Sequence, residues 1–184
     1  KLFKARMPIA AKDPIAAVLD EADKLGMHVM MGVGMYAWFD YTKGSLEWHK
    51  KVAKELYDMY GHHDSFYGFY VSEEGMGSLD CFETEPAKQA MRRKEVLDFF
   101  SNFRPFVKQL APDKPVMFAP NGWGVARAGN AYYELLKNVD MISPFAFNRM
   151  PEGDLTGKAA IELLQKYCNV WWHITTAPNP IFLD

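Results

Sequence analysis

The stretch that decides the fold is FYGFYVSEE, residues 66–74, an aromatic and apolar run that ends in two adjacent carboxylates. A short run of this kind is typical of a strand buried in a parallel sheet. We therefore predict a strand from Ser65 to Ser72, followed at once by Glu73 and Glu74. The carboxylates would then lie at the carboxyl end of the strand.

Outward from this strand, helical and strand patterns alternate along the chain. Helices are predicted at 14–25, 45–60, 87–110, 130–138 and from Leu155 or Gly157 to Tyr167, and strands at 28–34, 65–72, 114–119, 139–147 and 169–176. For the first helix, Asp13 is the expected N-cap and Gly26 the expected stop; Ser45 is the expected cap of the second. Strands that alternate with helices imply parallel strands joined by right-handed crossovers, so the fold class is α/β.

Two architectures fit this order. The favoured one is a (β/α)8 TIM-barrel type, present as a partial barrel of about five strands that forms a single domain over residues 1–184. The alternative is a five-strand doubly wound, flavodoxin-like sheet. Polar or aromatic residues follow strand after strand, which favours the barrel because a barrel uses all its strand ends. The chain begins with Lys1 as if in a loop after a missing strand, so we expect a fragment or a processed product.

Composition narrows the function classes. The chain has 184 residues, 49% of them hydrophobic, and two cysteines, which argues against disorder and against a disulfide-dense miniprotein. A formal net charge of −2 disfavours binding of nucleic acid through a basic surface. No apolar run approaches the roughly 18 residues of a membrane span. Aromatic residues make up 15%, an excess that suits a cleft stacking sugars or bases.

Glu73 and Glu74 are the candidate catalytic residues. Alternation along the strand directs Phe69, Val71 and Glu73 toward the helices and Tyr70, Ser72 and Glu74 toward the barrel interior, so Glu74 is preferred. A carboxylic acid at the rim of an aromatic cleft is partly desolvated, which raises its pKa and lets it donate a proton. The competing interpretation is a solvated pair at a strand end.

A glycosidase of the common type needs a second carboxylate about 5 to 9.5 Å from the first. The predicted last strand, 169–176, carries no acid. Asp40, Asp80, Glu83 and Asp140 are the possible substitutes, but no spacing selects one. Asp140 precedes its predicted strand and is expected at the opposite end of the sheet.

Seven residues follow the predicted strands or face inward on the last one, and could bind a sugar: Tyr36, Trp38, Asn121, Trp123, Asn148, Trp171 and His173. For each aromatic residue core packing is an equal alternative, and for each asparagine a turn role. The run His62-His63-Asp64 resembles a metal cluster but lies before a strand, so a surface turn is favoured. No cofactor is predicted, since the glycine-rich phosphate-binding patterns are absent, and no metal is predicted, since Cys81 and Cys168 lie too far apart in sequence for a zinc knuckle.

Three stretches, residues 19–34, 66–74 and 114–120, resemble the DUF4434-type, glycoside-hydrolase-like TIM barrels common in gut Bacteroidetes. The resemblance covers nearly the whole chain, as the third to seventh strands of that barrel. It implies that Glu74 is the strand-four glutamate, that Glu73 is the acidic position before it, and that the protein acts on carbohydrate in a secreted or periplasmic location. The chain departs from the family pattern in two ways. It lacks counterparts of the first two barrel strands and the last, and it carries His173 where a glycosidase nucleophile is expected.

The sequence thus yields two hypotheses of different class. The first is a glycoside hydrolase with Glu74 as acid/base and an aromatic cleft for the sugar. The second is a non-catalytic sugar-binding or degenerate barrel that keeps the cleft alone. Absence of a second inward carboxylate near Glu74 would favour the second. The oligomeric state is left open.

Overall fold

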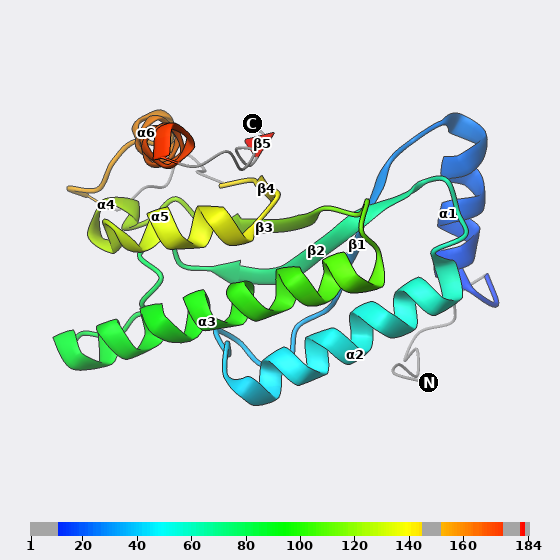
Figure 1. The fold of residues 1–184 in the computed structure, drawn as a ribbon, viewed down its shortest axis with the longest axis horizontal. Coiled ribbons are helices and arrows are strands. Elements are labelled where there is room, and N and C mark those ends of the chain that lie inside the picture. Colours follow the sequence, from blue (N-terminus) through cyan, green and yellow to red (C-terminus); the bar gives the residue numbers. More distant parts are fainter. Residues whose placement is uncertain (1–10, 145–151, 175–180, 183–184) are drawn as a thin grey trace.

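The computed structural model describes residues 11–144, 152–174 and 181–182, with the backbone alone at 73–75, 168–174 and 181–182. Its helices are α1 (Pro14–Leu25), α2 (Lys43–Tyr60), α3 (Pro86–Leu110), α4 (Val125–Ala128), α5 (Ala131–Leu135), the 3-10 helix η1 (Leu136–Asn138) and α6 (Gly157–Ile174). Its strands are β1 (Val29–Gly32), β2 (Phe66–Gly75), β3 (Val116–Pro120), β4 (Met141–Ile142) and β5 (Ile181–Phe182). Figure 1 shows the sheet between α1 at one end and α4 at the other.

The strands form one parallel sheet in the sequential order β1-β2-β3-β4-β5. The prediction of an α/β fold with parallel strands is therefore confirmed. A doubly wound sheet reverses its direction of winding at a switch point. The observed order contains no reversal, so the flavodoxin-like alternative is wrong.

The first helix begins and ends where the sequence predicts. Asp13 caps α1 by accepting a hydrogen bond from the backbone N–H of Ala16 at 3.0 Å, and Gly26 ends it with a left-handed φ of 63°. A left-handed residue at this position favours glycine because glycine has no Cβ to clash. The second helix begins earlier than predicted: Thr42, not Ser45, is its N-cap, and Ser45 is buried in the first turn.

The predicted last strand, 169–176, is wrong. Residues up to Ile174 belong to α6, and the fifth strand lies further on, at β5. Valine, tryptophan and isoleucine suggested a strand here, but these residues cost a helix only a few tenths of a kcal/mol each. Ala160 and Leu164 are buried at helical spacing, and no glycine or proline interrupts the chain between them and Ile174. The established helix therefore continues through the segment.

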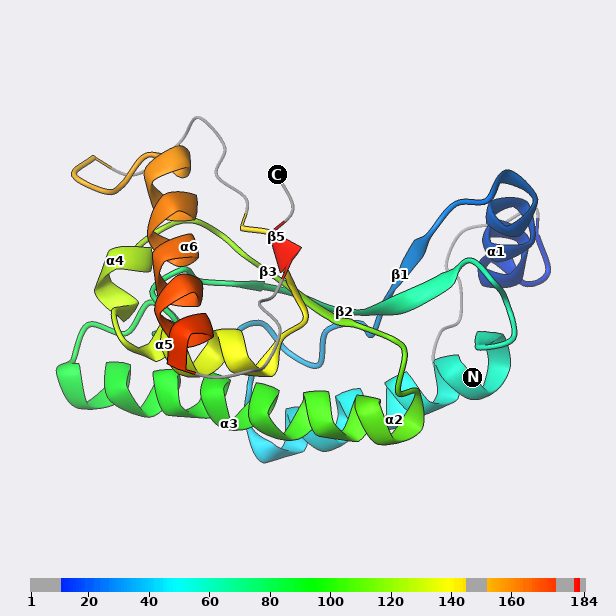
Figure 2. The same cartoon turned by 45° about the horizontal axis from the view of Figure 1, so that its top comes forward.

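Helices α2 and α3 lie side by side on one face of the sheet, as both Figure 1 and Figure 2 show. The core between them and the sheet is rich in phenylalanine, and its fully buried members include Phe66, Phe69, Phe99, Phe100, Phe103 and Phe118. Phe69 and Val71 of β2 face this core, as their alternation predicts. Gly32 and Ser72 share the other face, because a Cβ on Gly32 would lie 2.5 Å from the Ser72 hydroxyl.

Candidate functional site

The two candidate catalytic residues, Glu73 and Glu74, belong to the carboxyl-terminal part of β2. The strand is longer than predicted and includes Glu73 and Glu74 before it ends at Gly75. From Val71 to Gly75 it advances four residues while β3 advances two, from Phe118 to Pro120. The extra residues form a bulge, a feature that redirects side chains and is common beside active sites. The directions of both glutamate side chains stay predictions.

The loop after β1 carries two exposed aromatic side chains of the candidate set. Tyr36 is 49% and Trp38 67% exposed. The ring of Tyr36 lies 6.0 Å from that of Trp48, while Trp38 lies 5.9 Å from Phe39. Neither Tyr36 nor Trp38 belongs to the core, so the core alternative is wrong for both.

The loop after β3 is joined to the loop after β2 by Asn121. The Asn121 side-chain carbonyl accepts hydrogen bonds from the backbone N–H groups of Gly77 at 3.2 Å and Trp123 at 3.0 Å, and its amide group contacts the Met76 sulfur at 3.3 Å. The side chain is 4% exposed. Gly77 fits because a Cβ there would meet two backbone oxygens at 2.5 Å. The Asn121 side chain therefore links the two loops by hydrogen bonds, an arrangement that we call the loop clamp. Its polar atoms are buried and do not reach a sugar hydroxyl.

The remaining binding candidates fall into three groups. Trp123 is half-buried in the loop after β3. Trp171 and His173 belong to helix α6, so their predicted position near the end of a strand is wrong. Asn148 lies outside the described residues.

Sequence reasoning missed two aromatic residues beside the candidates. The rings of Phe39 and Phe82 meet edge to face at 5.1 Å, which joins the loop after β1 to the loop after β2. Phe82 is 56% exposed. A lone aromatic residue in the loop directly after the carboxylates is a signal that could have identified Phe82. The contact with Phe39 depends on tertiary structure.

The possible second carboxylates on the carboxyl side of the strands are already engaged. Asp80 is 2% exposed and lies between the Ser78 hydroxyl and Arg93, whose guanidinium is 3.2 Å away. Asp40 accepts hydrogen bonds from the backbone and hydroxyl of Thr42. Glu83 lies 3.7 Å from Arg92. Each of these acids stabilises a loop or a helix start.

Asp140 lies at the amino ends of the strands, as predicted. One of its carboxylate oxygens is 2.7 Å from Arg104, and the other accepts a hydrogen bond from the backbone N–H of Val116 at 2.9 Å. Lys108 lies 3.1 Å away. This charge network holds α3 to the starts of β3 and β4.

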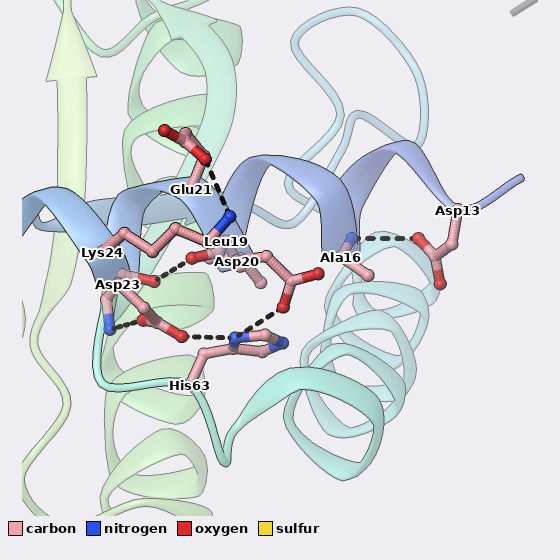
Figure 3. A network of polar contacts seen from close by, with 9 residues as sticks. Asp13, Ala16, Leu19, Asp20, Glu21, Asp23, Lys24 and His63 are labelled. Atoms are coloured by element: carbon pink, nitrogen blue, oxygen red, sulfur yellow. Dashed lines mark hydrogen bonds and ion pairs between the residues drawn. The ribbon is translucent and has the colours of Figure 1, made fainter. Parts of the chain in front are cut away.

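The run His62-His63-Asp64 also lies at the amino ends of the strands, but His63 is not on an open surface. Its side chain is 7% exposed and lies 2.7 Å from Asp23 and 3.9 Å from Asp20 of α1 (Figure 3). The backbone N–H of Ser65 donates to Asp23 at 2.7 Å. Hydrogen bonds from Ser65 and His63 lower the pKa of Asp23 from 3.8 to about 2. The network ties α1 to the start of β2.

Two further properties of the described residues concern metal binding and membrane-spanning helices. No group of three or more histidine, cysteine, aspartate and glutamate residues in the described ranges could hold a metal ion. Within the same ranges, no helix has the length and hydropathy needed to cross a membrane.

Comparison with known proteins gives one family and one solved structure. The structure is Bacteroides uniformis beta-glucuronidase 2 covalently bound to cyclophellitol-6-carboxylate aziridine; it is 15% identical, with a TM-score of 0.59 over 95% of this chain. The chain spans only 19% of that protein's length, so the likeness concerns the fold alone. No curated protein matches the chain. A family model described as a domain of unknown function, DUF4434, matches residues 1–183, and the chain therefore belongs to the DUF4434 family.

Proposed function

We propose that residues 1–184 form a single domain, a partial (β/α) barrel of glycoside-hydrolase type that acts on carbohydrate with Glu74 as acid/base and Glu73 beside it. One observation carries the proposal: the backbone of β2 includes Glu73 and Glu74 at the carboxyl end of a parallel sheet, in a bulge, and the loops after β1 and β2 expose aromatic rings. Ligands of parallel α/β folds bind at this edge. The shared fold with a glucuronidase supports the same substrate class.

The barrel part of the proposal is supported by the sequential strand order and by the edge of β1. Strand β1 lies at one border of the sheet, beside a cavity of about 340 Å³. The cavity is lined by apolar residues of α1 and α2, among them Ile15, Trp48, Val52, Leu56 and Met59. Parallel sheets normally have both faces and their edges covered. A further strand and helix of a barrel would cover this border.

The acid/base role is tested by Glu74→Gln, which keeps the shape of the side chain and removes the titrating proton. We expect turnover on a panel of aryl glycosides to fall by about 10²- to 10⁴-fold, while oligosaccharide binding persists. Glu134→Gln is the matched control, because Glu134 is an exposed glutamate of α5 whose carboxylate pairs with Lys137 at 2.8 Å. Unchanged turnover in Glu74→Gln would contradict the catalytic assignment.

A second candidate function is a sugar-binding barrel without turnover. The observation that favours it is the engagement of Asp40, Asp80 and Glu83 within the protein, together with the placement of Asp140 at the opposite end of the sheet. Binding of oligosaccharides by the wild-type chain with no hydrolysis of any glycoside in the panel would select this candidate.

A further inference from the structure

Two loops at the carboxyl edge of the sheet meet through aromatic side chains. Residues 33–41 follow β1 and residues 76–85 follow β2. Phe39 of the first loop contacts Phe82 of the second at 5.1 Å between ring centres, and Trp38 contacts Phe39 at 5.9 Å. The Cys81 thiol also donates to the Phe39 carbonyl at 3.7 Å. Trp38, Phe39 and Phe82 thus form one contiguous aromatic surface.

The rings of this aromatic surface lie largely in solvent. Trp38 is 67% and Phe82 56% exposed, with Phe39 half-buried between them. Exposing an aromatic ring forgoes the favourable burial of a large apolar area. Phe99, Phe100 and Phe103 of α3, by contrast, are buried almost completely.

The backbone that presents the rings is in an unfavourable conformation. Phe39, Leu79, Cys81 and Phe82 all have left-handed φ angles, between 54° and 64°, although none is glycine. Such conformations are costly for residues with a Cβ and are found where the surrounding structure enforces them, often at ligand sites.

Buried neighbours enforce this conformation. Leu79 and Asp80 are each 2% exposed, and Arg93 holds both the Asp80 carboxylate and the Ser78 carbonyl. In the other loop, Tyr41 is 3% exposed and packs edge to face on Phe99. Each loop is therefore anchored by buried residues next to its exposed rings: the loop after β1 by Tyr41, and the loop after β2 by Leu79 and Asp80.

Resting on the proposed function, we infer that Trp38, Phe39 and Phe82 bind the apolar face of a sugar ring, as a subsite for an oligosaccharide that extends outward from Glu74. One face of a pyranose presents mainly C–H groups, which pack on the negative face of an aromatic ring, and the loop that carries Phe82 leaves the strand that carries Glu74. A stable protein partner needs about 800 Å² on each side. Three partly exposed rings supply less, since a whole aromatic side chain buries about 150–250 Å².

The test measures binding of cello-, xylo- and manno-oligosaccharides, from disaccharide to hexasaccharide, by calorimetry on the full chain carrying Glu74→Gln, so that no substrate is consumed. Trp38→Ala and Phe82→Ala should each raise the Kd of the longer oligosaccharides about five- to tenfold. Trp38→Phe, which keeps a ring, should restore most of the affinity. Leu25→Ala is the control: Leu25 is 63% exposed but lies at the amino ends of the strands, so the Kd should not change.

The outcomes separate this inference from the proposed function. An unchanged Kd in both alanine variants, with turnover still lost in Glu74→Gln, overturns the subsite and leaves the proposed function standing. Failure of the wild-type chain to bind any oligosaccharide of the panel overturns both. A wild-type dimer that Trp38→Ala converts to a monomer, with sugar binding unchanged, overturns the subsite and assigns the surface to a second copy of the chain.

Discussion

The two ends of the sheet are built from different chemistry. At the amino ends of the strands, acids are paired with bases and with strand N–H groups: Asp23 with His63 and Ser65, and Asp140 with Arg104 and Val116. At the carboxyl ends, where Asp80 also pairs with Arg93, Trp38 and Phe82 are exposed, and Phe39 and Phe82 have left-handed φ angles. In parallel α/β folds the amino side stabilises and the carboxyl side holds the ligand. The contrast supports the proposal that the carboxyl end of the sheet binds the ligand.

The carboxyl end also contains the loop clamp formed by Asn121, and removing it has the largest expected effect on stability. Asn121→Ala leaves the N–H groups of Gly77 and Trp123 without their acceptor in a buried region, and should lower the free energy of unfolding by about 2–3 kcal/mol. Urea unfolding measures this. Asn121→Asp retains an acceptor and should lose less. An unchanged free energy of unfolding in Asn121→Ala would mean that the hydrogen bonds of Asn121 do not stabilise the loops.

The second prediction sharpens the contrast by measuring strain at Phe82. Glycine normally destabilises a folded chain relative to alanine, but at the left-handed φ of 64° the order should reverse. Phe82→Gly should be about 1 kcal/mol more stable than Phe82→Ala, since only the latter keeps a Cβ. Both variants lack the ring, so the difference excludes the aromatic contacts and reports backbone strain against the entropy cost of glycine.

Ala90→Gly provides the matched control for the strain measurement. Ala90 is an exposed residue inside α3, where the same change should destabilise by about 1 kcal/mol. Equal effects of glycine at both positions would show that the loop after β2 is unstrained.

The smallest expected effect is a pH dependence at the amino end. The folded-state pKa of Asp23, about 2, lies below its ordinary value of 3.8, so folding favours the charged form. The contribution is complete above about pH 4 and is lost as the pH falls toward 2. Asp23→Asn should therefore lower the melting temperature at pH 5 but converge with wild type near pH 2. Parallel curves over this range would remove Asp23 from the stabilising network.

The long, strongly patterned elements could be predicted from the sequence, while the ends of weaker ones could not. The bounds of α1 follow from Asp13 and Gly26, whose local chemistry sets a helix start and stop. The segment 169–174 misled because its β-branched and aromatic residues are compatible with either structure, and continuation of α6 decided the outcome. The bulge that holds Glu73 and Glu74 arises from pairing with β3, which strand periodicity does not reveal.

What the sequence by itself determined is the α/β class, the parallel strands and the position of two glutamates toward the carboxyl end of an aromatic strand. These depend on local periodicity and on residues adjacent in the chain. The tertiary structure decided which residues meet: Phe39 with Phe82, Asn121 with Gly77, and His63 with Asp23. Such contacts join residues far apart in sequence, and their geometry is set by packing of whole elements. For this physical reason the aromatic surface and the loop clamp emerged only from the fold.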